Sequence, residues 1–268
     1  MEDAISCYTD RIGFTAALEP TIHCLRGLHE AHLYNVPFEN FSMHTNTLDD
    51  ESLLEAIVHW RRGGICFETG LLMQATFDAC GFDCELRLGS VVTAGRSPAT
   101  HQVFVVRING DRWLFDIGFG ALGPRGPLRL ADGTELVHQA NSSRITLDAG
   151  SAVPKWTAST REHATNAETW QDLYTFVDAP AVAVDLEMAH FYTTRSPNSL
   201  LNKHKVASIP TPTGRISVRD DNLTVASDGT STTSKIIDRT ELKRLLGKHF
   251  GLTAPARDLG FEGQPCTI

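Results

Sequence analysis

The stretch that decides the fold is Arg61-Arg62-Gly63-Gly64-Ile65-Cys66-Phe67-Glu68, which is followed by an apolar-periodic run to Phe82. A glycine turn leads here into the start of a helix, so that Cys66 is placed at a helix N-terminus with two arginines just upstream. Unpaired helix N–H groups and nearby cationic side chains both stabilise a thiolate over a thiol. The sequence therefore makes Cys66 a candidate nucleophile.

Helical periodicity surrounds this stretch and predicts a helical bundle over residues 1–84. One helix is expected after Leu18-Glu19-Pro20-Thr21 and ends near Asn35. A second helix is expected to begin in Asp49-Asp50-Glu51. A third runs from Cys66 to a C-cap at Gly81, since glycine is the usual residue at that position.

From about residue 84 the period of the apolar residues changes from 3.6 to 2, which is typical of strands. Strands are expected at 84–92, 101–108, 112–119, 142–148 and 169–177, and they predict an antiparallel sheet or small barrel over residues 85–195. Further strands at 205–207, 215–219 and 223–226 precede a last helix, which starts at Asp238 with Glu241 at capping-box spacing. Residues 196–268 therefore form a third, α/β segment. The fold class predicted is α+β.

The composition of the chain argues against some classes of function. The chain has 268 residues, 41% hydrophobic and 21% charged, with a net charge of −8. This acidic balance argues against nucleic-acid binding through phosphate contacts. No run of apolar residues is long enough to span a bilayer. The first eleven residues, MEDAISCYTDR, have no apolar core typical of a signal peptide, so a cytoplasmic protein is expected.

The chain has six cysteines, which are expected to be reduced thiols in a cytosolic enzyme. They are Cys7, Cys24, Cys66, Cys80, Cys84 and Cys266. Cys80 and Cys84 have no second Cys/His pair at zinc spacing. No metal site is expected.

A cysteine nucleophile needs a base, and the base needs a group that orients it. His101 begins the strand HQVFVVRI, which Asn109-Gly110 joins to RWLFDIG. Asn-Gly favours a two-residue hairpin turn in which Ile108 pairs with Asp111. That register puts His101 and Asp116 on one face as diagonal neighbours, about 7–8 Å apart at the backbone.

Each of these residues also has an ordinary structural interpretation. Taken alone, Asp116 fits an exposed edge strand, and His101 fits a surface histidine or a core histidine with its hydrogen bonds satisfied. A thiol at a helix start together with His and Asp on one hairpin face favours a catalytic triad of Cys66, His101 and Asp116.

The loop after this hairpin, from Gly118 to Gly123, matches the dinucleotide-binding fingerprint. Pro124, Gly126 and Pro127 exclude the helix that would hold a pyrophosphate, so a Rossmann site is rejected. Glycine still lets backbone amides approach a ligand closely, which makes Gly120 a candidate substrate-binding residue.

With these motifs in hand, the chain resembles the arylamine N-acetyltransferases from Tyr8 to nearly the C-terminus. The resemblance is carried by five motifs in the family's order: VPFEN (36–40), RRGGICFE (61–68), HQVFVV (101–106), FDIGFG (115–120) and SPNS…PTPTGR (196–215). Their combination is highly specific, whereas VPFEN or PTPTGR alone would not be.

The resemblance implies a helical bundle, a β-barrel and an α/β lid around a cysteine-protease-like Cys-His-Asp core. It implies ping-pong transfer of an acetyl group from acetyl-CoA, through a Cys66 thioester, to an arylamine, hydrazine or hydroxylamine. His101 would shuttle protons and Asp116 would orient it. Acetyl-CoA is then a co-substrate, with no bound cofactor.

The resemblance also assigns supporting roles. Phe38 and Phe119 correspond to the family's aromatic walls for the amine ring, and Arg62 to a structural partner of Glu39 that braces the turn before Cys66. Taken alone, the two aromatics are more often core residues, and the ion pair is an ordinary surface pair.

Three departures from the family pattern are visible, the first being a loop between Phe41 and Leu48 that looks a few residues short. Gly70 stands where the family commonly has Asn, and Leu200-Leu201 stands where it has Pro-Phe. An enlarged, less aromatic cleft would suit a relative of the same superfamily, the amide synthases, which take an acyl chain from a carrier protein and join it to an arylamine. A transglutaminase- or papain-like amidase is a second alternative, and a non-catalytic binding module a third.

Overall fold

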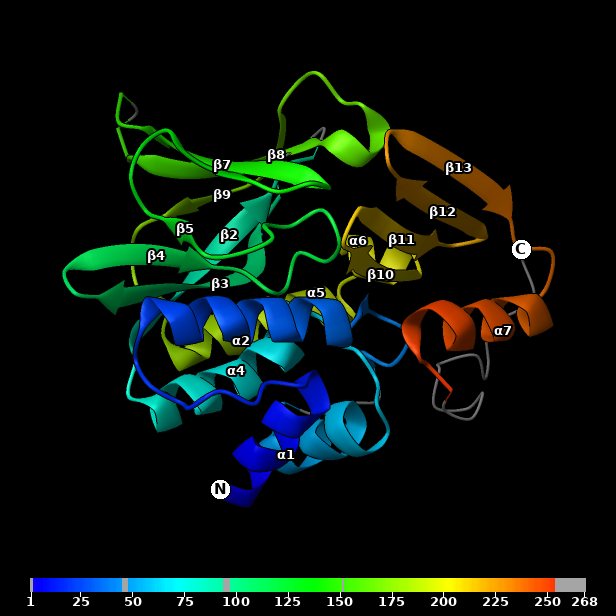
Figure 1. Cartoon of the computed structure of the whole chain (residues 1–268), viewed down its shortest axis with the longest axis horizontal. Helices are drawn as coiled ribbons and strands as arrows, with labels where there is room; N and C mark the ends of the chain where they lie inside the picture. The colour runs from blue at the N-terminus through cyan, green and yellow to red at the C-terminus, as the bar shows by residue number, and fades with distance from the viewer. Residues whose placement is uncertain (1, 45–47, 94–96, 151, 254–268) are drawn as a thin grey trace.

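The computed structural model describes residues 2–44, 48–93, 97–150 and 152–253. Figure 1 shows a helical part, a strongly curved eight-stranded sheet above it and a five-stranded sheet beside both. This arrangement confirms the predicted fold class. Within these residues, no helix is long and apolar enough to cross a membrane. Cys266 lies outside the described residues.

The helices are α1 (Glu2–Ile12), α2 (Ile22–Asn35), α3 (Asp50–Leu53), α4 (Cys66–Cys80), α5 (Ala183–Arg195), α6 (Leu200–Lys203) and α7 (Arg239–Phe250), with a π-helical turn over Leu54–His59 and a 3₁₀ turn over His163–Thr165.

Helices α2 and α4 confirm two sequence predictions. Thr21 caps α2, because its side chain accepts a hydrogen bond from the backbone N–H of Cys24. Gly81 ends α4 in the left-handed conformation with φ of 75°. The second predicted helix begins as α3 but continues as the π-helical turn. There Arg11 Nε donates to the carbonyl of Ile57 at 3.0 Å.

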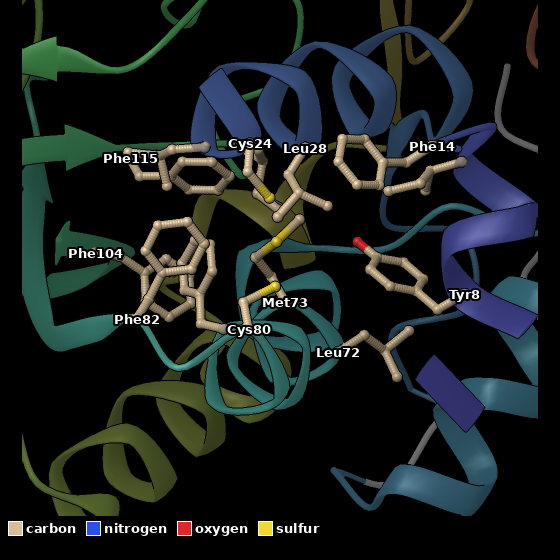
Figure 2. Close-up of a cluster of buried hydrophobic side chains, with 14 of the residues drawn as sticks. Tyr8, Phe14, Cys24, Leu28, Leu72, Met73, Cys80, Phe82, Phe104 and Phe115 are labelled. Carbon is tan, nitrogen blue, oxygen red and sulfur yellow. The ribbon is translucent and has the colours of Figure 1, made fainter. Parts of the chain in front are cut away.

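The helical part packs around one apolar core, which also receives side chains from the eight-stranded sheet. Figure 2 shows Tyr8 from α1, Leu28 from α2 and Met73 from α4 converging with Phe104 and Phe115 of the sheet. Aromatic rings meet edge to face there, which stabilises the core beyond the effect of burying their apolar surface. Helix α4, which carries Cys66, is thereby fixed against the sheet.

The eight strands of the larger sheet are β2 (Asp83–Val91), β3 (Ala99–Ile108), β4 (Asp111–Phe115), β5 (Leu128–Arg129), β6 (Thr134–Val137), β7 (Asn141–Asp148), β8 (Lys155–Glu162) and β9 (Gln171–Val177). Their order is β5-β4-β3-β2-β9-β8-β7-β6, all antiparallel. Edge strands β5 and β6 contact each other, so the sheet is a nearly closed barrel.

The β3–β4 hairpin has the predicted register, with Ile108 opposite Asp111 and Phe104 opposite Phe115. Asn109 and Gly110 have φ of 51° and 84°, as a type I′ turn requires. The strand expected over 112–119 ends earlier, at Phe115, so Asp116 follows the strand instead of lying in it.

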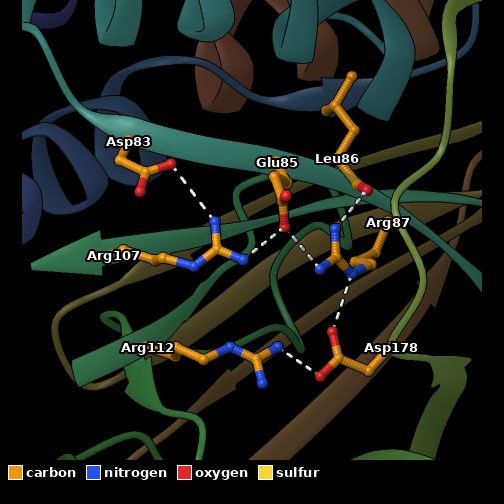
Figure 3. A network of polar contacts seen from close by, with 7 residues as sticks. All are labelled: Asp83, Glu85, Leu86, Arg87, Arg107, Arg112 and Asp178. Carbon is orange, nitrogen blue, oxygen red and sulfur yellow. Dashed lines mark hydrogen bonds and ion pairs between the residues drawn. The ribbon is translucent and has the colours of Figure 1, made fainter. Parts of the chain in front are cut away.

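A network of ion pairs joins the strands on the face of the sheet that also carries Val103 and Val105 (Figure 3). Arg87 is buried and pairs with Glu85 at 2.9 Å and with Asp178 at 3.0 Å. Arg107 also pairs with Glu85, and Arg112 with Asp178. Glu85 and Asp178 each bridge two arginines, which links β2, β3 and β4 to the residue after β9.

The smaller sheet contains β1 (Phe38–Glu39), β10 (Val206–Thr211), β11 (Gly214–Arg219), β12 (Asn222–Ser227) and β13 (Thr230–Lys235), in that order. Helix α7 packs on it through Leu246 and Phe250. Asp238 caps α7 as predicted, because its side chain accepts from the backbone N–H of Glu241 at 2.8 Å. Strand β1 comes from the helical part of the sequence, so this sheet is shared.

Helix α5 was not expected from the sequence, which assigned residues 85–195 to the barrel. The helix follows Pro180 and its N-cap is Val182, which offers no side-chain acceptor, so the usual start signal is missing. Strand β8 was likewise not predicted. The proposed boundaries at residues 84 and 195 stay a prediction.

Candidate active site

Cys66 is the first residue of α4, and it follows a turn that only glycine fits. A Cβ on Gly63 would lie 2.0 Å from the carbonyl oxygen of Pro37. The turn then enters the helix at Ile65, whose backbone N–H donates to Glu68 Oε2 at 2.8 Å. This bond satisfies one of the amides that a helix start leaves unpaired. The thiol is buried, with 6% of the residue exposed.

Glu39 and Arg62 stabilise this turn through their contacts with each other and with the backbone. Both are buried, and Arg62 Nε lies 3.6 Å from Glu39 Oε1. Glu39 also accepts from the backbone N–H of Phe41 at 2.6 Å, and its own N–H donates to the carbonyl of Gly64 at 3.2 Å. The contact expected between Glu39 and Arg62 is therefore present. Arg61, by contrast, is exposed.

His101 and Asp116 contact each other as the hairpin geometry predicts. His101 Nε2 lies 3.0 Å from Asp116 Oδ2, and both residues are buried. Asp116 Oδ1 accepts from the backbone N–H groups of Gly118 and Phe119 at 2.9 and 3.2 Å. These two N–H groups thus bond to the Asp116 side chain and not to a neighbouring strand. The local bonds form a turn, which is why β4 ends at Phe115.

Cys66 lies on the other side of the His101 ring. It is close enough to the ring to contribute to the raised pKa of His101, and because Nε2 already faces Asp116, Nδ1 is the nitrogen left for the thiol. A Cβ on Gly118 would lie 2.4 Å from Cys66 Cβ and 3.6 Å from His101 Cε1. Glycine at 118 therefore lets the loop press against both residues. The structure brings Cys66, His101 and Asp116 together.

The electrostatics of this cluster favour a charged imidazole. Burial alone lowers the pKa of His101, but the negative charge and hydrogen bond of Asp116, with a smaller contribution from Cys66, raise it to about 10. Burial raises the pKa of Asp116, but the charge and hydrogen bond of His101 and the bond from Gly118 lower it overall. At neutral pH the pair is thus an imidazolium and a carboxylate.

A cavity of about 390 Å³ opens onto the thiol. Cys66, His101, Phe38 and Phe119 line it, so the two aromatic residues expected beside the thiol border the same cavity. Gly120 is not among its lining residues. A Cβ there would lie 2.5 Å from Ser208 Oγ, so Gly120 serves the close packing of its loop on β10.

Several lining residues were missed by the sequence analysis. Tyr192 and Thr193 come from α5, and Lys203 comes from α6. Apolar residues at helical spacing in 184–191 were the signal that could have revealed α5. Leu200 and Leu201, where the family pattern has Pro-Phe, also line the cavity.

Gly70 has a clear packing role. A Cβ at this position would lie 2.3 Å from the side-chain nitrogen of Gln102, which lies beside His101 on β3. The side chain of Gln102 therefore occupies the space that a residue other than glycine would need. In the part of the chain that the structure describes, no group of three or more His, Cys, Asp or Glu side chains could hold a metal ion.

Comparison with known proteins adds to this geometry. A family model described as N-acetyltransferase matches residues 21–259. The chain belongs to the arylamine N-acetyltransferase family. Membership makes it an enzyme of acetyl transfer, for which acetyl-CoA is the family's co-substrate.

Individual relatives in the arylamine N-acetyltransferase family span nearly the whole chain. The Salmonella typhimurium arylamine N-acetyltransferase / N-hydroxyarylamine O-acetyltransferase is 29% identical over 261 residues, covering 94% of this chain and 90% of that protein. The solved Mycobacterium abscessus enzyme has a TM-score of 0.89 at 25% identity, covering 96% and 92% of the two chains. The Mycobacterium marinum enzyme, solved in complex with CoA, has a TM-score of 0.84 at 27% identity, covering 96% and 97%.

Proposed function

We propose that the chain transfers an acetyl group from acetyl-CoA to the nitrogen of an arylamine, hydrazine or hydroxylamine, through a thioester on Cys66. The observation that carries this proposal is the buried Cys66–His101–Asp116 cluster at the wall of an aromatic-lined cavity. Asp116 orients His101 and keeps its imidazolium charged.

In the first half-reaction, the Cys66 thiolate attacks the thioester carbon of acetyl-CoA. A bond forms between Sγ and the acetyl carbon, and the bond between that carbon and the CoA sulfur breaks. The His101 imidazolium gives its proton to the departing CoA sulfur, so free CoA leaves as a thiol. The raised pKa of His101 supports this role, because the group carries the needed proton at neutral pH.

In the second half-reaction, the amine nitrogen attacks the acetyl carbon on Cys66. The carbon–sulfur bond breaks, Cys66 returns to the thiolate, and neutral His101 accepts the proton that the nitrogen loses. Phe38 and Phe119 hold the amine's ring. Both line the cavity, and the ring of Phe119 lies 5.3 Å from that of His101.

Two alternatives are weaker. The relatives reported above are arylamine N-acetyltransferases and give no support to an amide synthase fed by a carrier protein. The same relatives favour acyl transfer over a transglutaminase- or papain-like amidase.

Intact mass measurement after brief incubation with acetyl-CoA tests the proposal. We expect one added acetyl group, mapped to Cys66 by peptide analysis, and its loss when a hydrazine is added. Cys66→Ala should take up no acetyl group, whereas Cys84→Ala, which removes a partly exposed thiol elsewhere, should acetylate like the unaltered chain. An acetyl group on any other residue, or none at all, would refute the mechanism.

A further inference from the structure

The outward face of α5 is apolar and exposed, the reverse of an ordinary surface helix. Val184 is 57% exposed, and Met188 and Phe191 are each 67% exposed. Their spacing of four and three residues places them in one line along the helix. We call these three residues the α5 stripe. Contiguous exposed apolar side chains of this kind mark an interaction surface.

A groove runs beside the α5 stripe. Its volume is about 500 Å³, and Met43 and Leu48 line the side opposite the helix. None of the three residues of the α5 stripe lines the substrate cavity, to which α5 contributes Thr193 from its opposite face and Tyr192 from beside the stripe. The stripe is therefore a surface separate from the active site, on the far side of one of its walls.

The charges around the α5 stripe are ordered along the helix. Asp185 and Glu187 lie near the N-terminal end, and Arg195 is the last helical residue. Among the described residues, neither Glu187 nor Arg195 forms a salt bridge with another side chain. This face of α5 is acidic at its N-terminal end and basic at its C-terminal end. When two such helices lie antiparallel, the acidic end of each faces the basic end of the other.

We propose that the α5 stripe binds a second copy of this chain, with the two α5 helices antiparallel about a two-fold axis near Phe191. Phe191 then packs on the partner's Phe191, while Glu187 faces the partner's Arg195 and Arg195 faces the partner's Glu187. Such an isologous contact is the commonest form of protein dimer. The antiparallel arrangement also places opposite helix-dipole ends together.

A lipid surface fits the stripe less well. The carboxylates of Asp185 and Glu187 border it, and the whole chain carries a net charge of −8, so an anionic bilayer would repel this face. The α5 helix is only 13 residues long, so its contact area lies at the low end for protein interfaces. The dimer is therefore weak and depends on protein concentration.

Sedimentation velocity of the full chain over a range of concentrations tests this. We expect a monomer–dimer equilibrium that Phe191→Glu and Met188→Glu each shift at least tenfold toward monomer. Val137→Glu is the matched control, because Val137 is 72% exposed on the barrel strand β6, away from α5. Circular dichroism checks that each variant is folded. Monomer at every concentration, or a dimer indifferent to Phe191→Glu, would overturn the proposal.

A charge exchange tests the antiparallel geometry. Glu187→Arg and Arg195→Glu should each weaken the dimer, because each places like charges opposite one another. The double variant should restore it, because both pairs are again complementary. A double variant as weak as the sum of the two single changes would exclude this arrangement.

Discussion

Asp116 holds three kinds of contact at once, and each depends on its position just after β4. One carboxylate oxygen faces His101, the other accepts two backbone amides, and its own carbonyl accepts from His29 Nε2 at 2.9 Å. The carboxylate is thus fixed before any substrate binds. Preorganisation of this kind lets a charged group act without reorienting during the reaction.

Replacement of Asp116 by Asn should expose this dependence. The amide removes the negative charge that raises the pKa of His101, so burial then dominates and the pKa falls. We expect acetylation of Cys66 to slow by about 10³–10⁴-fold, as in comparable triads. Rapid-mixing measurements of CoA release from pH 6 to 10 check this. Asp111→Asn, in the same hairpin but exposed, is the control, and a loss below tenfold for Asp116→Asn would contradict the assignment.

Gly118 provides a steric test of the same site. A Cβ at this position would meet Cys66 Cβ at 2.4 Å, so Gly118→Ala must displace the thiol or the loop. We expect a large fall in kcat with the fold retained. At Gly126 in the same loop, a Cβ would meet only Leu136 Cδ2, at 3.3 Å, so Gly126→Ala should stay within about threefold of the unaltered activity. Equal activity of the two variants would refute the packing argument.

Among the elements, the turn before α4 depends most on buried charge. Glu39 and Arg62 are removed from water together with the backbone groups that Glu39 holds. A buried ion pair of this kind adds little net stability, but a broken one is costly because the remaining charge has no compensation. The position of Cys66 relies on this pair through Gly63 and Gly64.

Glu39→Gln should therefore destabilise the chain strongly although it conserves shape. We expect a loss of about 3–5 kcal/mol in the free energy of unfolding, measured with urea. Arg129→Ala removes an exposed ion pair with Asp111 and should cost under about 1 kcal/mol. Similar losses for both variants would contradict the claim that the buried Arg62 charge depends on Glu39.

Sequence patterns predicted those elements whose signals are local. Asn109-Gly110 determined the hairpin register, and Gly81 and Asp238 marked helix ends, because each acts within a few residues. Helix α5 was not predicted because its N-cap residue, Val182, has no side chain that can accept a hydrogen bond. The shared sheet of β1 with β10 also escaped, since pairing between residues so far apart in the chain leaves no local trace. The contact between His101 and Asp116 was predictable because both residues belong to one hairpin.

At the scale of the whole molecule, buried histidines set the pH range of stability. Burial lowers the pKa of His29 to about 4 and that of His32 to about 3. Both bind fewer protons in the folded chain than in the unfolded chain below pH 6.5. His101, with a pKa of about 10, binds more. His29 and His32 therefore stabilise the folded chain at neutral pH, and His101 stabilises it below pH 10.

Stability should therefore fall on both sides of about pH 6.5. On the acid side it falls as pH drops from 6.5 toward 4, where His29 alone contributes about 3 kcal/mol. On the alkaline side it falls as pH rises from 6.5 through the folded-state pKa of His101 at about 10. Urea unfolding at a series of pH values measures both limbs. His101→Gln should reduce only the loss of stability above pH 6.5. If that loss is unchanged in this variant, it does not come from His101.

The pairing of β1 with β10 bears on the order in which a growing chain becomes complete. Phe38 pairs with Ser208 and Glu39 with Ala207, so the strand beneath the Cys66 turn gains its neighbour only after most of the chain has been made. Synthesis proceeds at about 5–20 residues per second, which leaves a period of several seconds in which the thiol-bearing helix exists without that support. We expect the Cys66 turn to be among the last parts of the chain to reach its final conformation, because β1 gains its neighbour only when the C-terminal sheet has docked.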